Sequence, residues 1–169
     1  MELLFSEDES RISGFFDALE LLKDTEAAVG LPDSAPERCR WLLALHERGA
    51  PGAHIPPRPV VSPALARPET RRAVAEGLLS ACAAAAEGRP DSVTEGFEQA
   101  GRAGADGIRA YIDAGISPGN APLTVSGGWI RNFSSGRPVY VPGKGFDKPL
   151  YDTGALYRAF DFEVRKRSG

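Results

Sequence analysis

The sequence predicts an α+β fold, in which a small antiparallel or mixed sheet is flanked by about four helices. Several segments carry apolar residues at helical spacing, while two short segments have the pattern of strands. A long stretch rich in glycine and proline separates the last predicted helix from the C-terminal strand. With 169 residues, 42% hydrophobic and 25% charged, the chain is ordinary for one globular domain. We therefore treat residues 1–169 as a single domain.

The first helix and the first strand are predicted close to the N-terminus. Residues 9–23 have a helical apolar stripe and a polar back. The members of the stripe are Ile12, Phe15, Phe16, Leu19 and Leu22. Residues 27–31 are short and end at Pro32, which removes a backbone donor, so we expect a strand there.

Three further helical segments follow. Residues 36–48 end before Gly49, a typical C-cap, and residues 69–87 follow Pro68, which suits a first helical position. A third helix should be capped by Asp91 or Ser92 and continue to about residue 112. Gly101 and Gly104 fall on its apolar face, which suggests that another backbone packs closely there.

Residues 116–147 are predicted to form an extended, flexible arm. Glycine, proline and serine are dense, and only Trp129, Ile130 and Phe133 suggest a short amphipathic turn. Gly143-Lys144-Gly145 lacks the pattern of a phosphate loop and is expected to be a surface turn. After the arm, residues 160–165 alternate apolar and charged side chains, so we expect a half-buried strand that pairs with residues 27–31.

Two proline-containing motifs are the most informative features of the chain. In Ile55-Pro56-Pro57-Arg58-Pro59 the prolines favour an extended rod. The rod is expected to hold Arg58 outward for a bidentate bond to a carboxylate, either Glu47 or an acidic group of a partner.

The second motif is Lys148-Pro149-Leu150-Tyr151-Asp152-Thr153-Gly154-Ala155-Leu156. Asp152 or Thr153 is suited to capping a following helical turn, and Gly154 permits a tight approach. Leu156 then returns to apolar packing. We interpret this segment as a docking terminus.

The order of these motifs resembles that of the tail-completion or neck proteins of tailed bacteriophages. The resemblance covers roughly residues 25–166: a helix ending in His46-Glu47-Arg48-Gly49, an Ile-Pro-x-Arg-Pro-like stretch, two helices, and Pro-Leu-x-Asp-Thr-Gly-x-Leu before the final strand. It implies a virion component that joins neck and tail as a ring of identical subunits and completes the head-proximal end of the tail. A head-side adaptor or head-closure ring that contacts the portal is the alternative.

The same resemblance implies partners and a location. The expected partners are further copies of the chain and other phage neck and tail proteins, with transient contact to DNA in the lumen left open and no membrane partner. The expected location is the neck/tail junction of the virion, after synthesis in the host cytoplasm. The candidate interface residues are Ile55, Pro56, Pro57, Arg58, Pro59, Trp129, Leu150, Asp152, Thr153, Gly154 and Leu156.

The sequence contains one motif that resembles a catalytic one. Residues 152–155 match the Asp-Thr-Gly-Ala of aspartic proteases, but only 15 residues follow Gly154 and the chain has no second copy of the motif. A small hydrolase using Asp152 is therefore a distant alternative. His46-Glu47 lacks the second histidine of a metalloprotease helix, and with two histidines in all we expect no metal site and no cofactor.

Composition argues against further classes. The net charge of −3 argues weakly against a general nucleic-acid binder, which needs a basic footprint, and leaves a local basic patch open. Cys39 and Cys82 fall in separate helical segments without metal-ligand spacing, so we expect buried free thiols. No apolar run approaches the roughly 20 residues of a membrane span, and the acidic N-terminus does not look like a signal peptide.

Overall fold

A computed structural model describes residues 2–132, 134–151 and 153–167, and its architecture confirms the α+β class. The described residues form seven α-helices, one short 3₁₀ helix and two separate antiparallel sheets of two strands each. In chain order the elements are α1 (Glu2–Asp24), β1 (Thr25–Gly30), α2 (Glu37–Arg48), η1 (Pro51–Ala53), α3 (Val61–Ala66), α4 (Pro68–Ala86), α5 (Pro90–Asp113), α6 (Pro122–Ser126), β2 (Gly127–Arg131), β3 (Pro138–Pro142), α7 (Ala155–Ala159) and β4 (Asp161–Lys166).

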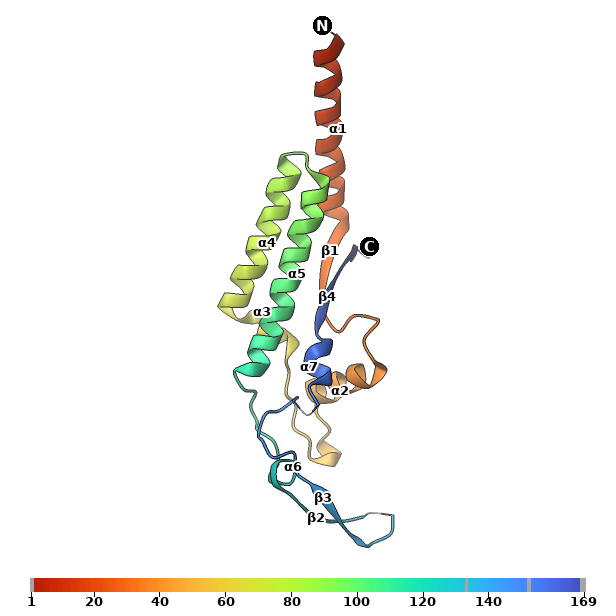
Figure 1. Cartoon of the computed structure of the whole chain (residues 1–169), viewed down its shortest axis with the longest axis vertical. Helices are drawn as coiled ribbons and strands as arrows, with labels where there is room; N and C mark the ends of the chain where they lie inside the picture. Colours follow the sequence, from red (N-terminus) through yellow and green to blue (C-terminus); the bar gives the residue numbers. More distant parts are fainter. Residues whose placement is uncertain (1, 133, 152, 168–169) are drawn as a thin grey trace.

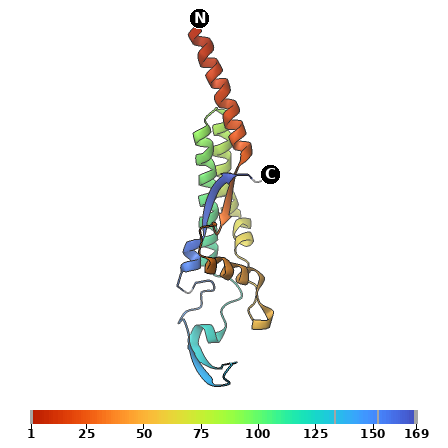
Figure 2. The same cartoon turned by 90° about the vertical axis from the view of Figure 1, so that its right-hand side faces the viewer.

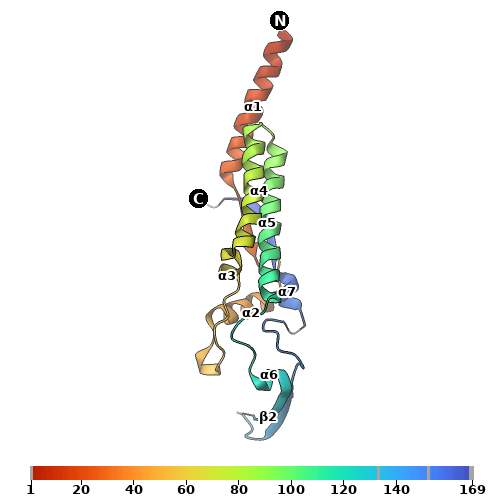
Figure 3. The same cartoon turned by 90° about the vertical axis from the view of Figure 1, so that its left-hand side faces the viewer.

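The molecule is elongated, with different elements projecting at its two ends (Figure 1). Helices α4 and α5 form an antiparallel pair in the upper half, and the N-terminal part of α1 extends beyond the turn that joins them. The opposite end is the hairpin of β2 and β3, which stands away from the long helices α1, α4 and α5 in all three views and has the short α6 at its base (Figures 1, 2 and 3). The chain thus presents a helix at one end and a β-hairpin at the other.

Small residues bring α4 and α5 into close contact. A Cβ added at Gly77 would lie 2.5 Å from the backbone nitrogen of Ala100, and one added at Gly96 would lie 2.5 Å from that of Ala81. The two backbones therefore touch where these residues cross. At Gly101 and Gly104 the expected close packing of another element is present, since strands β4 and β1 pack against α5 there. The atoms nearest to an added Cβ belong to the side chains of Phe162 and Val29 and not to a backbone.

The sheet of β1 and β4 joins the two ends of the chain against α5. The register pairs Ala27 with Val164 and Val29 with Phe162, which confirms the expected pairing of residues 27–31 with 160–165. The apolar side chains of this sheet are half-buried, and those of Val29 and Phe162 lie against Gly104 and Gly101 of α5. Phe160, immediately before β4, is completely buried.

Two apolar clusters form the core. One lies at the junction of α1, α4 and α5 and is built largely from alanines with Val93 and Phe97. The other joins α2, α3, α5 and α7, and Leu150 and Leu156 of the C-terminal motif belong to it. The second cluster thus packs the C-terminal motif against α2, α3 and α5.

Several sequence predictions differ from the structure. The first helix begins at Glu2, seven residues before the predicted start, and α3 was not predicted. Helix α5 begins at Pro90 and has no side-chain cap bond, so the expected caps at Asp91 or Ser92 were wrong. Both cysteines are free, but only Cys39 is buried, since Cys82 lies on an exposed part of α4.

The arm also contains more regular structure than its composition suggested. Helix α6 and the hairpin occupy much of residues 116–147, and Trp129 and Ile130 lie in β2 rather than in a helical turn. The third residue of that expected turn, Phe133, lies outside the described residues. Isolated two-stranded hairpins are marginally stable in water, so the flexibility of this arm stays a prediction.

Candidate functional site

The first proline motif is extended, but its arginine turns inward. Ile55 pairs with Ala50 in an isolated bridge, and Pro57 and Pro59 are exposed. Arg58 is only 5% exposed, and its Nε and Nη2 donate to the carbonyl oxygens of Pro118 and Gly119, both at 2.6 Å. The expectation that the rod holds Arg58 outward was therefore wrong. The guanidinium instead fixes the start of the arm within the same chain.

Glu47 has a different role from the one expected. Its Oε1 accepts hydrogen bonds from the backbone N–H groups of Val60, at 2.8 Å, and Val61, at 3.1 Å. These groups lie at the N-terminus of α3. A carboxylate there accepts hydrogen bonds from N–H groups that lack a partner within the helix, and its negative charge interacts favourably with the positive end of the helix dipole. Glu47 thus caps α3 and does not pair with Arg58.

Three sets of hydrogen bonds close the base of the arm, which we call the arm root. The first set is the two hydrogen bonds from Arg58 to the carbonyl oxygens of Pro118 and Gly119. In the second, Asp147 Oδ1 accepts from the backbone N–H and the side-chain amide of Asn120, both at 2.8 Å. In the third, Lys144 Nζ donates to the carbonyl oxygens of Lys148, at 2.7 Å, and Tyr151, at 2.9 Å. The arm root therefore holds the two ends of the arm side by side.

The electrostatics of the arm root agree with this geometry. The hydrogen bonds from Asn120 hold the pKa of Asp147 below its usual value. A second link follows one residue later, where Lys148 Nζ lies 2.6 Å from Asp113 Oδ1 and Tyr157 donates to Oδ2 of the same carboxylate at 2.7 Å. The hydrogen bond from Lys148 is the main reason that the pKa of Asp113 is lowered. Asp113 thereby joins the end of α5 to the C-terminal motif.

The C-terminal motif packs as a docked turn. Leu150 and Leu156 are buried, and Leu150 has a φ of 64°, a left-handed conformation that non-glycine residues rarely adopt. Gly154 has a φ of 77° and precedes α7, and Thr153 Oγ1 accepts a hydrogen bond from the N–H of Ala155 at 3.3 Å. Asp152 lies outside the described residues.

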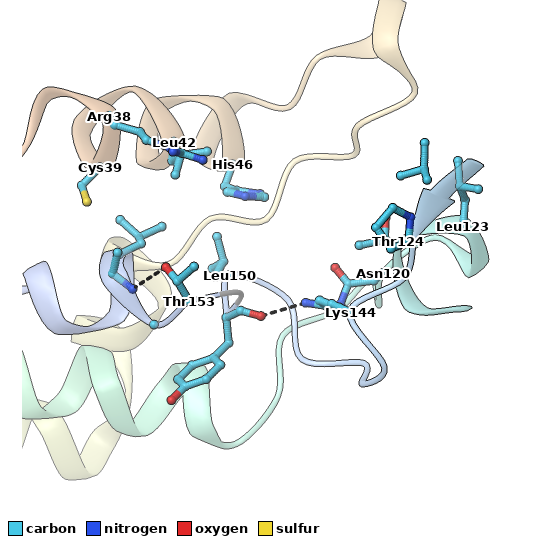
Figure 4. A pocket seen from close by; sticks show the side chains of 16 residues that line it. Arg38, Cys39, Leu42, His46, Asn120, Leu123, Thr124, Lys144, Leu150 and Thr153 are labelled. Carbon is cyan, nitrogen blue, oxygen red and sulfur yellow. Dashed lines mark hydrogen bonds between the residues drawn. The ribbon is translucent and has the colours of Figure 1, made fainter. Parts of the chain in front are cut away.

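A pocket of about 520 Å³ lies between α2, the arm root and this turn (Figure 4). Its wall is mainly apolar and includes Leu42, Leu123, Val141, Leu150 and Leu156. In Figure 4 the labelled side chains of Leu42 and His46 extend from α2 toward the segment that carries Leu150. The pocket thus collects residues from three segments that are far apart in the sequence.

His46 places a buried ring nitrogen in this wall. Its Nδ1 is buried, and none of the described residues forms a hydrogen bond with it. Burial lowers the pKa of His46 below its usual value of 6.5, and the positive charges of Arg58 and Lys144 act in the same direction. His46 therefore favours the neutral form in the folded chain.

We expect the free energy of unfolding to fall as the pH falls below about 6.5. In that range the unfolded chain, with an ordinary histidine pKa, binds more protons than the folded chain, so acid favours unfolding; above it this contribution is fully present. His46→Gln should flatten this dependence in urea titrations between pH 8 and 5.5, above the range in which the carboxylates titrate.

The matched control is His54→Gln, because His54 lies exposed on the turn after η1. An equal pH slope in the wild type and in His46→Gln would show that His46 is not responsible.

The structure brings five of the eleven predicted site residues to one region. Arg58, Leu150, Thr153, Gly154 and Leu156 surround the arm root and the pocket. Trp129 lies away from them on the hairpin and is 72% exposed, with its ring 5.6 Å from that of Tyr140. Arg58 therefore holds the start of the arm and Trp129 is exposed on its hairpin, whereas Ile55, Pro56, Pro57 and Pro59 are not among the residues that line the pocket.

Sequence reasoning missed Asn120, Lys144 and Asp147. Lys144 lies in the segment expected to be a surface turn, and nothing in its neighbourhood indicated that its ammonium group would bond to carbonyls four and seven residues later. The pairing of Asn120 with Asp147 joins residues 27 positions apart. Such contacts depend on the closure of the hairpin, which the sequence pattern did not predict.

Comparisons of the chain with protein-family models, curated proteins and solved structures find no match. Among the described residues, no group of three or more His, Cys, Asp or Glu side chains is placed to hold a metal ion. Within the same residues, no helix has the length and apolar character to cross a membrane.

Proposed function

We propose that this chain is a structural virion protein of a tailed phage or prophage, which joins neck and tail as part of a ring that completes the head-proximal end of the tail. The proposal starts from the order of the two proline motifs, which resembles that of tail-completion and neck proteins. Its role is assembly, without catalysis, and its partners are copies of itself and neighbouring neck and tail proteins.

The observation that carries the proposal is what the two motifs do together. Arg58 of the first motif anchors the start of the arm, and Lys144 is bonded to carbonyls of the second motif at the arm's end. The tip of the arm that they support is the β2–β3 hairpin, on which Trp129 and Tyr140 are exposed. Side chains of this kind are enriched in protein interfaces. A subunit whose two proline motifs hold an arm with an exposed aromatic hairpin is suited to binding other subunits.

The chemistry of the pocket supports an assembly role over an enzymatic one. Its wall is mainly apolar, and Lys144 already donates to two backbone carbonyls. Among the described residues, which do not include Asp152, none forms a hydrogen bond with Nδ1 of His46 that would orient the ring as a general base. Nucleophilic and acid–base mechanisms need such groups within hydrogen-bonding distance of one another.

Deletion of the gene from an inducible prophage that encodes this chain tests the proposal. Induction should yield DNA-filled heads and free tails that do not join, visible by negative-stain microscopy, and the chain supplied from a plasmid should restore joined particles. Gold-labelled antibody should bind at the neck/tail junction of complete particles. Label on the portal of tailless heads would favour the head-side adaptor, whereas normal particles after deletion would contradict both roles.

A further inference from the structure

One face of the hairpin is aromatic and basic, and none of the described residues covers it. In the register of β2 and β3, Trp129 lies opposite Tyr140, and Arg131 lies two residues farther along the same face. Trp129 is 72% and Tyr140 52% exposed, and their rings pack edge to face. Val141, on the other face, contributes to the pocket. The Trp129/Tyr140 face is therefore the outer face of the arm.

A second apolar surface lies on α1, at the other end of the molecule (Figure 1). Four residues at helical spacing form an exposed stripe, which we call the α1 stripe: Ile12, Phe15, Phe16 and Leu19, with exposed fractions of 58%, 38%, 63% and 38%. The inner side of the same helix is already used, since Ala18 is completely buried against the core. The α1 stripe thus remains exposed beside the side of the helix that packs against the core through Ala18.

The charges around these two surfaces are complementary. The sequence of α1 contains seven acidic and two basic residues, and Glu9 and Glu20 lie on the same side of the helix as Phe16. The hairpin, residues 127–142, contains Arg131 and Arg137 and no acidic residue. Opposite charges that border two apolar surfaces favour the encounter of these surfaces and fix its orientation.

We infer that the Trp129/Tyr140 face of one copy binds the α1 stripe of a second copy, so that subunits associate head to tail. The two surfaces differ and lie at opposite ends of the chain, so the contact is heterologous, and contacts of this type close into rings when their rotation permits. The inference names the subunit contact of the proposed ring and rests on that proposed function for its biological setting.

Charge also argues against the other occupants of the α1 stripe. Two acidic helices placed side by side would repel each other, which disfavours pairing of α1 with α1. Anionic lipid surfaces attract basic helices, so α1 is poorly suited to a membrane surface. The basic aromatic hairpin of a second copy satisfies both the apolar and the electrostatic requirement.

Two variants of the full-length chain test the contact by sedimentation velocity over a range of concentrations. Phe16→Asp removes the stripe and keeps the hairpin, whereas Trp129→Ala with Tyr140→Ala removes the aromatic face and keeps the stripe. We expect the wild type to form oligomers and each variant to associate at least about 30-fold more weakly, as expected for the loss of interface hot spots.

Mixing the two variants gives the deciding result. An equimolar mixture should form 1:1 heterodimers, because one intact stripe and one intact hairpin remain, and nothing larger. If the hairpin variant alone stays oligomeric, α1 pairs with itself; if the α1 variant alone stays oligomeric, the hairpin does. Either result overturns the inference, as does a wild-type chain that is monomeric at every concentration.

Matched controls use exposed apolar residues outside both surfaces. Leu79→Asp on α4, where Leu79 is 67% exposed, controls for Phe16→Asp, and Trp41→Ala on α2, where Trp41 is 62% exposed, controls for Trp129→Ala. Both should associate like the wild type.

The prophage assay separates the two proposals. If the chain forms head-to-tail oligomers but deletion of its gene causes no joining defect, only the virion role is contradicted. If deletion causes a joining defect but Phe16→Asp does not weaken the oligomers, only the proposed contact is contradicted.

Discussion

Gly96→Val is expected to lower the free energy of unfolding by about 3 kcal/mol, at the upper end of the usual cost of overpacking. A Cβ at this position would lie 2.5 Å from the backbone nitrogen of Ala81 and 2.7 Å from its Cα. A helix backbone cannot rotate away as a side chain can, so α4 and α5 must separate. Urea unfolding followed by circular dichroism measures the loss, with an unchanged m-value expected for a two-state transition.

Gly52→Val is the matched control, because no atom lies within 4 Å of a Cβ at that position. It should change the stability by no more than about 0.5 kcal/mol, the usual range for surface substitutions. A Gly96→Val chain as stable as this control would mean that the two helices do not cross with their backbones in contact.

The sequence predicted the elements whose side chains repeat along the chain. The alternation of residues 160–165 identified β4, and the helical stripe that contains Val93 and Ile108 identified α5, because one buried face forces such a period. Helix α3 was missed because its six residues are too few to show a helical period. The hairpin was missed because glycine and proline in residues 127–142 hide its alternation.

The residues of the candidate site were easier to predict from the sequence than the hydrogen bonds that these residues make. The two proline motifs were recognised as important, yet the inward orientation of Arg58 depends on where residues 118 and 119 pass. No local pattern specifies that encounter across about 60 positions. Glu47 shows the same limit, since its role as a cap of α3 requires a helix that had not been predicted.

Arg58→Ala is expected to detach the start of the arm and to cost about 3 kcal/mol, since a hydrogen bond from a charged group contributes about 1.5 to 3 kcal/mol and two such bonds are lost. The side chain is 5% exposed, so water does not readily replace it. Arg58→Lys should recover little of the loss, because an ammonium group cannot reproduce the two parallel bonds of the guanidinium fork. Thermal unfolding measures the stability of both variants.

Hydrogen exchange shows whether this loss is centred on the arm. In the wild-type monomer the amides of residues 116–147 should exchange faster than those of α5, and in Arg58→Ala the segment after Gly119 should exchange faster still while α5 changes less. Arg72→Ala, at an exposed position of α4, is the control and should leave the arm unchanged. Uniform acceleration throughout the chain would mean that Arg58 supports the whole fold. Slow exchange across residues 116–147 of the wild-type monomer would mean that the arm is rigid before assembly, so that Arg58 fixes the position of a preformed hairpin and does not restrain a flexible one.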